Sequence, residues 1–490
     1  MTLDKQDKKL LELKTTPYKH QLDILEDTWN REYYAILWEM GVGKSKLCID
    51  TVASLFIKDR INGFLIIAPK GVYLNWYYEE IEKHMPDQID YAIGYWSAIM
   101  RKHEEYQARS VMIPENGTLD ILLVNIEALR SKRAFEFTST FLKQHEALTC
   151  IDESSTIKSP KAIQTKSCLK LGKLSSYRRI MTGTPITQSP LDLFSQFQFL
   201  KQGLLGFTNF TAFKSFYAEQ TQIRMGQRSF MKVTGFRNID VLKERMATHS
   251  SRITKEEALD LPDKVFSHLY VMLTGKQKQV YDAVLNDAFV MLNKQEESGE
   301  LTITNVLTAL VKIQQVTCGH CKDDEGKVCE IESNRVEALL SRLKELGDKK
   351  VIIWCAFRHD VELITAAISK EFPDKSYVTY KGGQNNDERI KALDLFKYKD
   401  CQFMISTSAA SKGLTLVECC ANIYFSMSYN LENFLQSQDR THRIGQERVV
   451  TYDLMMAKDT IDEKIVKTLE KKKDLAESVL TGWRDLFEVS

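Results

Sequence analysis

The sequence lacks any long apolar run. Nowhere in the 490 residues does an apolar stretch approach the roughly 18 residues that a membrane-spanning helix needs. The N-terminal stretch MTLDKQDKKLLELK is polar and charged, without the apolar region of a secretory signal peptide. These two absences exclude an integral membrane protein and predict a cytoplasmic protein with no membrane partner.

The chain also lacks a strong charge of one sign and a cysteine framework. Its formal net charge is only +1, so a surface that binds nucleic acid must be local rather than a property of the whole molecule. The ten cysteines are scattered, several of them inside apolar runs such as TCID and IIWCAF. This pattern is typical of reduced, buried thiols in a cytosolic protein and not of a disulfide scaffold.

Short-period repeats and low-complexity tracts are absent as well, whereas apolar runs of strand length recur in two regions. The first region contains YYAILW, GFLIIAP, DILLVN, LTCID and RRIMTG, and the second contains KKVIIWCAF, SYVTY, CQFMIST, ANIYFS and VVTYDLMM. Each run ends where polar or glycine residues begin. This rhythm predicts parallel sheets wrapped by helices, with functional loops at the carboxyl ends of the strands.

A chain of this length predicts about two to four domains. We predict an α/β fold with two lobes, at residues 1–200 and 333–456. Residues 201–332 contain few strand runs and are predicted to form a mainly helical segment between the lobes. Residues 457–490 are predicted to form a lysine-rich C-terminal helix.

The stretch AILWEMGVGKSKLCID predicts a strand, a glycine turn and a helix. Its glycines would let backbone amides approach phosphate oxygens, the lysine would reach the β and γ phosphates, and the serine hydroxyl would take a magnesium position. The nucleotide-contacting residues would be Gly41, Val42, Gly43, Lys44 and Ser45. The consensus GxxxxGK[ST] has a glycine where this chain has Trp38, so an ordinary strand-to-helix turn is the alternative.

The stretch LTCIDESSTIKSP places Asp152 and Glu153 at the carboxyl end of an apolar strand. P-loop nucleotidases need such a pair, because the aspartate holds magnesium and the glutamate orients and activates the attacking water. An acidic pair can instead cap a helix N-terminus. The order of the two motifs in one lobe favours a nucleotide site.

A third strand end, RRIMTGTPI, carries Thr182 and Thr184 on either side of a glycine. These hydroxyls could sense the γ-phosphate, or the segment could be a tight structural turn. This stretch alone does not distinguish the two.

Taken together, these motifs resemble those of the superfamily-two helicases. The ordered set comprises Tyr18–Gln21, EMGVGKS, IIAP, CIDES, MTGTP, STSAASKGLTL and QSQDRTHRIGQ. Within that superfamily the chain is similar to the Swi/Snf-related ATPases, which move along double-stranded DNA, and the ending DRTHRIGQ is close to that group's arginine motif. The resemblance extends from about residue 15 to 475 and implies two RecA-like lobes followed by a bracing helix.

The resemblance assigns further residues. Gln21 would recognise adenine, and Gln436 would belong to the nucleotide site. Arg440 and Arg443 would come from the second lobe and face the γ-phosphate of ATP bound to the first. Such an arginine finger stabilises charge in the transition state and couples the chemistry to closure of the lobes.

The chain departs from the family pattern at two motifs. Ser155 stands at the fourth position of DESS, where many relatives have histidine. In the fifth motif Ser408 replaces a common arginine, and Ala410 and Ser411 replace glycines. These departures leave the contacts of the fifth motif to DNA and nucleotide open.

The resemblance implies an enzyme that hydrolyses ATP with Mg²⁺ to move along or remodel DNA, with double-stranded DNA as the expected partner. One alternative is a strand-separating or fork-remodelling helicase on DNA or RNA. Another is a nucleotide-dependent DNA-binding switch with negligible turnover, against which the intact Glu153, Arg440 and Arg443 argue. The compact size predicts a monomeric bacterial or viral member, in the cytoplasm of a bacterium or a virus-infected host cell.

Residues 201–255 contain ten lysines and arginines against three acidic residues, a local charge of +7. These cations could neutralise DNA phosphates. The interleaved aromatic residues have helical spacing, which predicts core packing rather than base stacking. The stretch TCGHCKDDEGKVC superficially resembles a zinc knuckle, but no second CxxC follows and a structural turn is the favoured interpretation.

Overall fold

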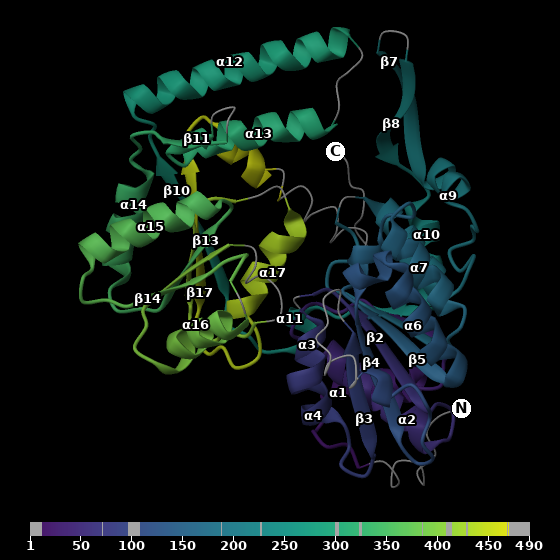
Figure 1. The fold of residues 1–490 in the computed structure, drawn as a ribbon. Coiled ribbons are helices and arrows are strands. Elements are labelled where there is room, and N and C mark those ends of the chain that lie inside the picture. The colour runs from purple at the N-terminus through teal and green to yellow at the C-terminus, as the bar shows by residue number, and fades with distance from the viewer. Residues whose placement is uncertain are drawn as a thin grey trace. The chain divides into compact units, whose positions relative to one another are not determined.

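The structure is a computed structural model that describes residues 12–70, 72–96, 108–187, 189–225, 228–298, 303–322, 326–384, 386–407, 414–427, 430–467 and 469. The fifth-motif positions Ser408, Ala410 and Ser411 and residues 470–490 of the predicted C-terminal helix lie outside this part of the chain. The chain forms two compact units that divide near residue 260, except that residues 220–234 group with the second unit (Figure 1). None of the helices in the described residues is both long and apolar enough to cross a membrane.

The first unit contains a seven-stranded sheet in the order β3-β4-β2-β5-β6-β1-β9, and its strand pairs are parallel, as the sequence predicted. Its strands are β1 (Tyr33–Ile36), β2 (Gly63–Ala68), β3 (Tyr91–Trp96), β4 (Leu119–Asn125), β5 (Ala147–Asp152), β6 (Tyr177–Met181) and β9 (Ser250–Ser251). The central strands β2, β4 and β5 are buried along their whole length, which explains their continuous apolar runs.

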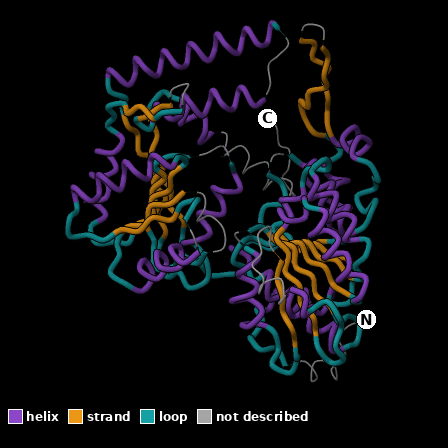
Figure 2. Tube along the Cα trace, viewed as in Figure 1, coloured by secondary structure: helices purple, strands orange, loops and turns teal. Residues whose placement is uncertain are grey.

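Helices cover both faces of this sheet (Figures 1 and 2). The α-helices are α1 (Lys19–Thr28), α2 (Lys44–Ile57), α3 (Tyr73–Asn75), α4 (Ile81–His84), α6 (Lys132–Gln144), α7 (Ile163–Gly172), α8 (Leu193–Leu200), α9 (Phe210–Tyr217), α10 (Ile239–Ala247) and α11 (Lys255–Ala258). Shorter helical turns are the π-helical Trp76–Glu80 and the 3-10 turns Ile126–Arg130, Ser154–Ile157 and Pro190–Asp192. Alternate residues of each strand enter two separate cores, such as Leu65 and Ile67 on one face and Phe64 and Ile66 on the other.

The second unit contains a six-stranded parallel sheet in the order β10-β17-β16-β13-β15-β14. Its strands are β10 (Lys264–Val271), β13 (Val351–Cys355), β14 (Tyr377–Tyr380), β15 (Phe403–Thr407), β16 (Ala421–Tyr424) and β17 (Val450–Ala457). Its helices are α12 (Gly275–Glu297), α13 (Ile303–Thr317), α14 (Arg335–Leu346), α15 (Arg358–Glu371), α16 (Asn386–Tyr398) and α17 (Leu431–Thr441). Two apolar cores again lie on opposite faces of the sheet.

The segment 201–332 is mainly helical, as predicted, but it contains more strands than expected. Besides helices it contains the two-stranded sheets β7 (Ala218–Met225) with β8 (Arg228–Phe236) and β11 (His320–Lys322) with β12 (Val328–Glu330), together with β9 and β10. It is also split between the units, since β9 pairs with β1 in the first and β10 pairs with β17 in the second. The strand β10 was not predicted from its sequence KVFSHLYV, because this edge strand is half exposed and therefore carries polar residues.

A buried ion pair joins several elements of the second unit. Arg335 Nη1 lies 2.5 Å from Asp462 Oδ2, and the other guanidinium nitrogens donate to the carbonyls of Phe425 and Met455, each at 2.7 Å. Asp462 Oδ1 accepts a hydrogen bond from Thr317 Oγ1 at 3.0 Å. The pair thus holds the end of α13, the start of α14 and the chain that follows β17 in one arrangement.

Asp462→Ala should destabilise the second unit by about 3–5 kcal/mol, because it leaves the Arg335 guanidinium buried without a counter-charge. Hydrogen exchange of β16 and β17 peptides across a urea series measures this loss. The matched control is Asp348→Ala, which breaks the exposed pair with Lys375 and should change little. Equal unfolding midpoints for Asp462→Ala and wild type would contradict the expectation.

Candidate active site

A glycine turn joins β1 to α2, where the sequence predicted a phosphate site. Gly41 and Gly43 have φ angles of 81° and 90°, in the left-handed region that glycine adopts without steric cost. Gly43 is the N-cap of α2, so the free N–H groups of the first helical turn face this loop, an arrangement suited to phosphate. The side chain of Val42 is buried in the core, which leaves only its backbone for a nucleotide.

Lys44 begins α2, and its Nζ atom donates hydrogen bonds to the carbonyls of Trp38 at 3.0 Å and Glu39 at 3.1 Å. Lys44 and Ser45 are both only partly buried, so their side chains border the turn. Trp38 is buried, and its indole N–H donates to Ser251 Oγ at 2.8 Å. Trp38, which departs from the P-loop consensus, therefore points into the protein and not into the glycine turn at residues 41–43 (the phosphate turn).

Gln21 lies on α1 against the same turn and is 1% exposed. Its Nε2 donates to the carbonyl of Gly43 at 2.9 Å, and its Oε1 accepts from the backbone N–H of Tyr18 at 2.8 Å. A Cβ atom on Gly43 would lie 2.1 Å from Gln21 Nε2, so this approach requires glycine. The structure thus brings Gln21 to the phosphate turn with its carboxamide bonded inside the protein, and its contact with adenine stays a prediction.

Asp152 ends β5 and is 7% exposed. Its Oδ2 accepts a hydrogen bond from Trp76 Nε1 at 2.9 Å, and its Oδ1 accepts from the backbone N–H of Glu153 at 2.9 Å. Burial raises the pKa of Asp152, while the Trp76 N–H and the positive charge of Lys44 act in the opposite direction. Trp76 was not predicted as a site residue.

The Ser45 hydroxyl and the Asp152 carboxylate are oxygen ligands of the type that Mg²⁺ prefers. Among the described side chains, no group of three or more His, Cys, Asp and Glu residues could hold a metal ion. The Asp152 carboxylate at the end of β5 and the Ser45 hydroxyl at the start of α2 fit a magnesium ion that arrives with nucleotide phosphates, because Mg²⁺ is usually bound through one or two carboxylates plus phosphate oxygens.

Glu153 follows directly and has a left-handed backbone, with φ 51° and ψ 56°. This conformation in a residue other than glycine is strained by about 1–3 kcal/mol and is common at functional sites. The carboxylate is 8% exposed, and its Oε2 accepts a hydrogen bond from Thr182 Oγ1 at 3.3 Å. Thr182 Oγ1 in turn accepts from the backbone N–H of Thr184 at 3.1 Å. The turn of Thr182, Gly183 and Thr184 (the TGT turn) therefore contacts the predicted catalytic residue Glu153.

Gly183 brings this TGT turn against the phosphate turn. A Cβ atom at Gly183 would lie 3.1 Å from Met40 Cγ and 3.2 Å from Met40 N. The three turns follow β1, β5 and β6, which are neighbours in a parallel sheet and therefore end at the same edge. The sheet thus assembles the predicted first-lobe residues at one place.

Gln196 on α8 links the acidic motif to the TGT turn, a role that was not predicted. Its Oε1 accepts from Ser154 Oγ at 2.8 Å, and its Nε2 donates to the carbonyls of Pro185 at 2.7 Å and Asp192 at 2.9 Å. It is fully buried within an otherwise largely apolar helix, and that polar residue on a buried face was the only signal. The neighbouring Ser155 hydroxyl is buried without a hydrogen-bond partner among the described residues.

The predicted arginines lie in and after α17 of the second unit, and their environments differ. Arg440 is 7% exposed, with Nε donating to the carbonyl of Gln436 and Nη1 to the carbonyl of Leu414, both at 2.9 Å. Arg443 is partly exposed, and its Nη1 donates to the Leu414 carbonyl at 3.4 Å. Gln436 is fully buried, and its Nε2 donates to Glu432 at 2.9 Å. Arg443 is therefore the more accessible of the two arginines.

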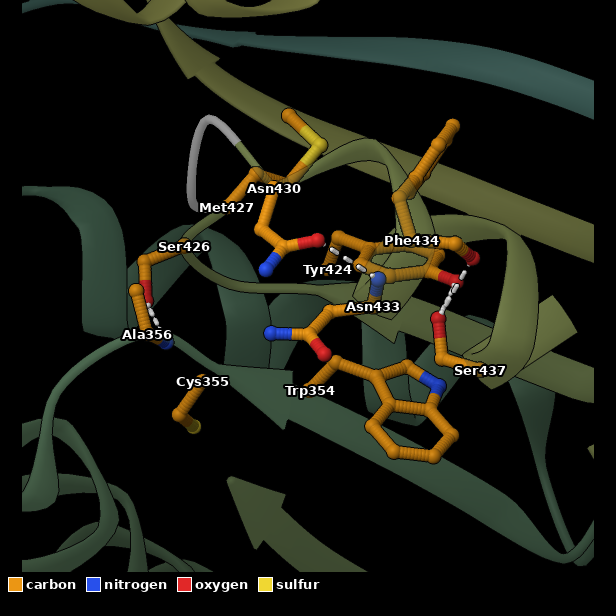
Figure 3. Close-up of a pocket in the computed structure, with 10 residues that line it drawn as sticks. All are labelled: Trp354, Cys355, Ala356, Tyr424, Ser426, Met427, Asn430, Asn433, Phe434 and Ser437. Carbon is orange, nitrogen blue, oxygen red and sulfur yellow. Dashed lines mark hydrogen bonds between the residues drawn. The ribbon is translucent and has the colours of Figure 1, made fainter. Parts of the chain in front are cut away.

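A pocket also lies in the second unit (Figure 3). It is bordered by the carboxyl ends of β13 and β16 and by α17, and it combines aromatic and polar side chains, among them Trp354, Tyr424, Asn433 and Phe434. Tyr424 reaches Ser437 with a 2.6 Å hydrogen bond between hydroxyls. None of the predicted site residues lines this pocket, although α17 carries both its wall and Arg440.

The cysteine and histidine residues near residue 320 belong to a hairpin of the second unit. Cys321 on β11 lies opposite Cys329 on β12. His320 is buried, and its Nε2 lies 2.7 Å from Asp360 Oδ1. The histidine of this segment thus has a carboxylate partner on α15.

The basic segment 201–255 uses part of its charge inside the first unit. Lys243 pairs with Asp240 at 3.0 Å, and Arg252 pairs with Glu39 at 3.2 Å. The aromatic prediction is confirmed, because these rings lie in or against the core: Phe207, Phe210, Phe213, Phe216, Tyr217 and Phe236. Asp240 is already subtracted in the count of +7, whereas Glu39 lies outside the segment, so only the Arg252 pair lowers that local charge further.

Two protein-family models match successive parts of the chain. A model of the SNF2-related domain matches residues 26–322, and a model of the helicase conserved C-terminal domain matches residues 334–445. An uncharacterized ATP-dependent helicase of Mycoplasma pneumoniae is 26% identical over 456 residues, which cover 92% of this chain and 40% of that protein. Chromodomain-helicase-DNA-binding protein 1 of Homo sapiens is 25% identical over 478 residues, covering 92% of this chain and 26% of that protein.

One solved structure, the Sulfolobus solfataricus SWI2/SNF2 ATPase core in complex with dsDNA, is 24% identical with a TM-score of 0.42 and covers 97% of this chain and 98% of that one. The chain spans at most 40% of the length of the two curated relatives. The SNF2-related match alone extends over more than half of the chain and includes the phosphate turn, the acidic pair and the TGT turn. The chain therefore belongs to the SNF2-related family.

Proposed function

We propose that this protein is an ATP-dependent DNA translocase, which hydrolyses ATP and uses the cycle to move along or remodel double-stranded DNA. The observation that carries the proposal is the convergence of three turns at one sheet edge. There the phosphate turn lies against Gly183, and Glu153 is bonded to Thr182. A nucleotide-binding turn alone would suit a switch, whereas a positioned glutamate beside it suits turnover.

The residues of the first unit have separate roles in binding and hydrolysing ATP. Lys44 leaves the carbonyls of Trp38 and Glu39 to bind phosphate oxygens, and Gln21 contacts the nucleotide base. Ser45 and Asp152 would hold Mg²⁺, which supplies charge neutralisation at the β and γ phosphates. Glu153 orients the attacking water and accepts its proton, with Thr182 fixing one carboxylate oxygen.

The second unit supplies Arg443, and Arg440 next to it, to the γ-phosphate when the two units close on ATP. Closure would assemble the catalytic set only transiently, so hydrolysis and reopening can be converted into movement. The partial exposure of Arg443 supports its role as the mobile finger. The buried Arg440 fixes the chain at Leu414, which lies within the fifth motif STSAASKGLTL.

DNA as the track is supported by the family resemblance of the motifs, by the curated relatives and by the basic segment. The human relative carries DNA binding in its name. Surface cations of the segment, such as Lys201 and Arg237, are exposed and could contact backbone phosphates. Backbone contacts carry no sequence information, so we expect little sequence preference.

Steady-state ATPase of the full chain at fixed low salt tests this function, with no nucleic acid, duplex DNA, single-stranded DNA or RNA. We expect stimulation mainly by duplex DNA. Stimulation mainly by single strands or RNA would instead favour a strand-separating helicase. Turnover that is indifferent to all three polymers would overturn the nucleic-acid motor.

A further inference from the structure

Trp76 contacts the proposed magnesium ligand from a part of the chain that no motif assignment includes. It follows β2 and begins the π-helical turn Trp76–Glu80 between α3 and α4. The side chain is 1% exposed, and its Nε1 donates a 2.9 Å hydrogen bond to Asp152 Oδ2. The contact joins two positions that are 76 residues apart.

The Asp152 carboxylate is held at both oxygens. Its Oδ1 accepts the backbone N–H of Glu153 at 2.9 Å, while Oδ2 accepts the indole N–H of Trp76. An ionised carboxylate offers about four lone-pair positions, so two donors leave acceptor positions for a cation. Because the donors approach different oxygens, they restrict rotation of the carboxylate plane and decide which lone pairs remain available.

The local backbone places Trp76 toward the sheet. π-helical turns are rare in proteins and frequently occur at functional sites. The ring of Tyr77, in this turn, lies 5.2 Å from that of Tyr95 on β3. The Trp76 ring meets Phe64 on β2 edge to face at 6.2 Å. Trp76 is thus buried against Phe64 with its N–H directed at Asp152, and a buried donor of this kind can fix the orientation of a carboxylate.

We propose that Trp76 is a positioning residue that orients the Asp152 carboxylate for the divalent cation of the ATP site. The proposal rests on the proposed function, because it deepens the role of the same nucleotide site. Hydrogen-bond partners of metal ligands commonly change metal affinity by about 10–100-fold when they are removed. The role belongs to the indole N–H, because that group makes the hydrogen bond to Asp152.

Trp76→Phe tests the proposal because it keeps an aromatic ring and removes the N–H donor. The measurement is the Mg²⁺ concentration that half-saturates binding of a fluorescent, non-hydrolysable ATP analogue to the full chain. We expect this concentration to rise by about tenfold or more. Binding of the analogue in EDTA should stay within about twofold of wild type, because a fault in packing alone would weaken both.

Trp29→Phe is the matched control. Trp29 is also a buried tryptophan of the first unit, but its Nε1 has no hydrogen-bond partner among the described residues. Its Mg²⁺ dependence should equal that of wild type. Should Trp76→Phe unfold, benzothienylalanine at position 76 replaces the N–H by sulfur with nearly the same shape and tests the same expectation.

An unchanged Mg²⁺ dependence in the folded Trp76 variant, or an equal shift in Trp29→Phe, would overturn the positioning role. Failure of the proposed function looks different. In that case wild type itself would bind the analogue without any dependence on Mg²⁺, or not at all.

Discussion

Glu153→Gln should lower DNA-stimulated ATP turnover by about 10²–10⁴-fold while ATP binding persists. The substitution is nearly isosteric and leaves an oxygen that can accept the Thr182 hydroxyl, which lies 3.3 Å from the carboxylate in wild type. What it removes is the negative charge that accepts a proton from the attacking water. Glutamine can adopt the same left-handed backbone conformation as glutamate at this position, so we expect the turn to keep its fold.

Single-turnover hydrolysis with saturating duplex DNA measures the chemical step, and equilibrium binding of an ATP analogue measures nucleotide affinity. Glu146→Gln is the matched control, since Glu146 is an exposed carboxylate immediately before β5. This substitution should leave ATP turnover unchanged. A Glu153→Gln variant with more than about a tenth of wild-type turnover would contradict the role of Glu153 as base.

Local motifs made much of the first-lobe site predictable. Each first-lobe motif is a short continuous stretch of sequence: the glycine turn with Lys44, and the acidic pair. Their chemistry depends on the local backbone, which strand-turn-helix patterns predict. The parallel sheets were predictable for the same reason, because buried central strands require continuous apolar runs. Half-exposed edge strands such as β10 have no such run and were missed.

Contacts between distant segments could not be predicted. The bond between Ser154 and Gln196 spans 42 residues, and that between Trp76 and Asp152 spans 76. A tryptophan after a strand usually packs in the core, and a single polar residue in an apolar helix does not identify its hydrogen-bond partner. Neither pattern therefore indicates which distant segment the side chain contacts. Only the order of the strands in the sheet brings these segments to one edge.

The structure also separates two arginines that the motif treats alike. Arg440 is buried and donates hydrogen bonds to the carbonyls of Gln436 and Leu414, so its replacement would disturb the second unit. Arg443 is partly exposed and makes a longer 3.4 Å contact with the same Leu414 carbonyl. An Arg440 substitution would therefore combine a folding defect with loss of its proposed catalytic role, whereas an Arg443 substitution would test the proposed catalytic role alone.

Arg443→Ala should reduce the rate of ATP hydrolysis by about a thousandfold or more, the effect expected for loss of an arginine finger. Affinity for ATP should change little, because the phosphate turn and Gln21 belong to the first unit. The thermal midpoint should also be close to that of wild type, since a partly exposed side chain with one long contact is removed.

The matched control is Arg448→Ala, which removes a nearby exposed arginine that likewise donates to a backbone carbonyl, that of Glu418. Single-turnover rates, ATP affinity and thermal midpoints of both variants provide the comparison. If Arg443→Ala hydrolysed ATP as fast as Arg448→Ala, the second unit would contribute no finger through this residue. Coupling of hydrolysis to closure would then depend on Arg440, whose burial would have to be relieved before it could reach a phosphate.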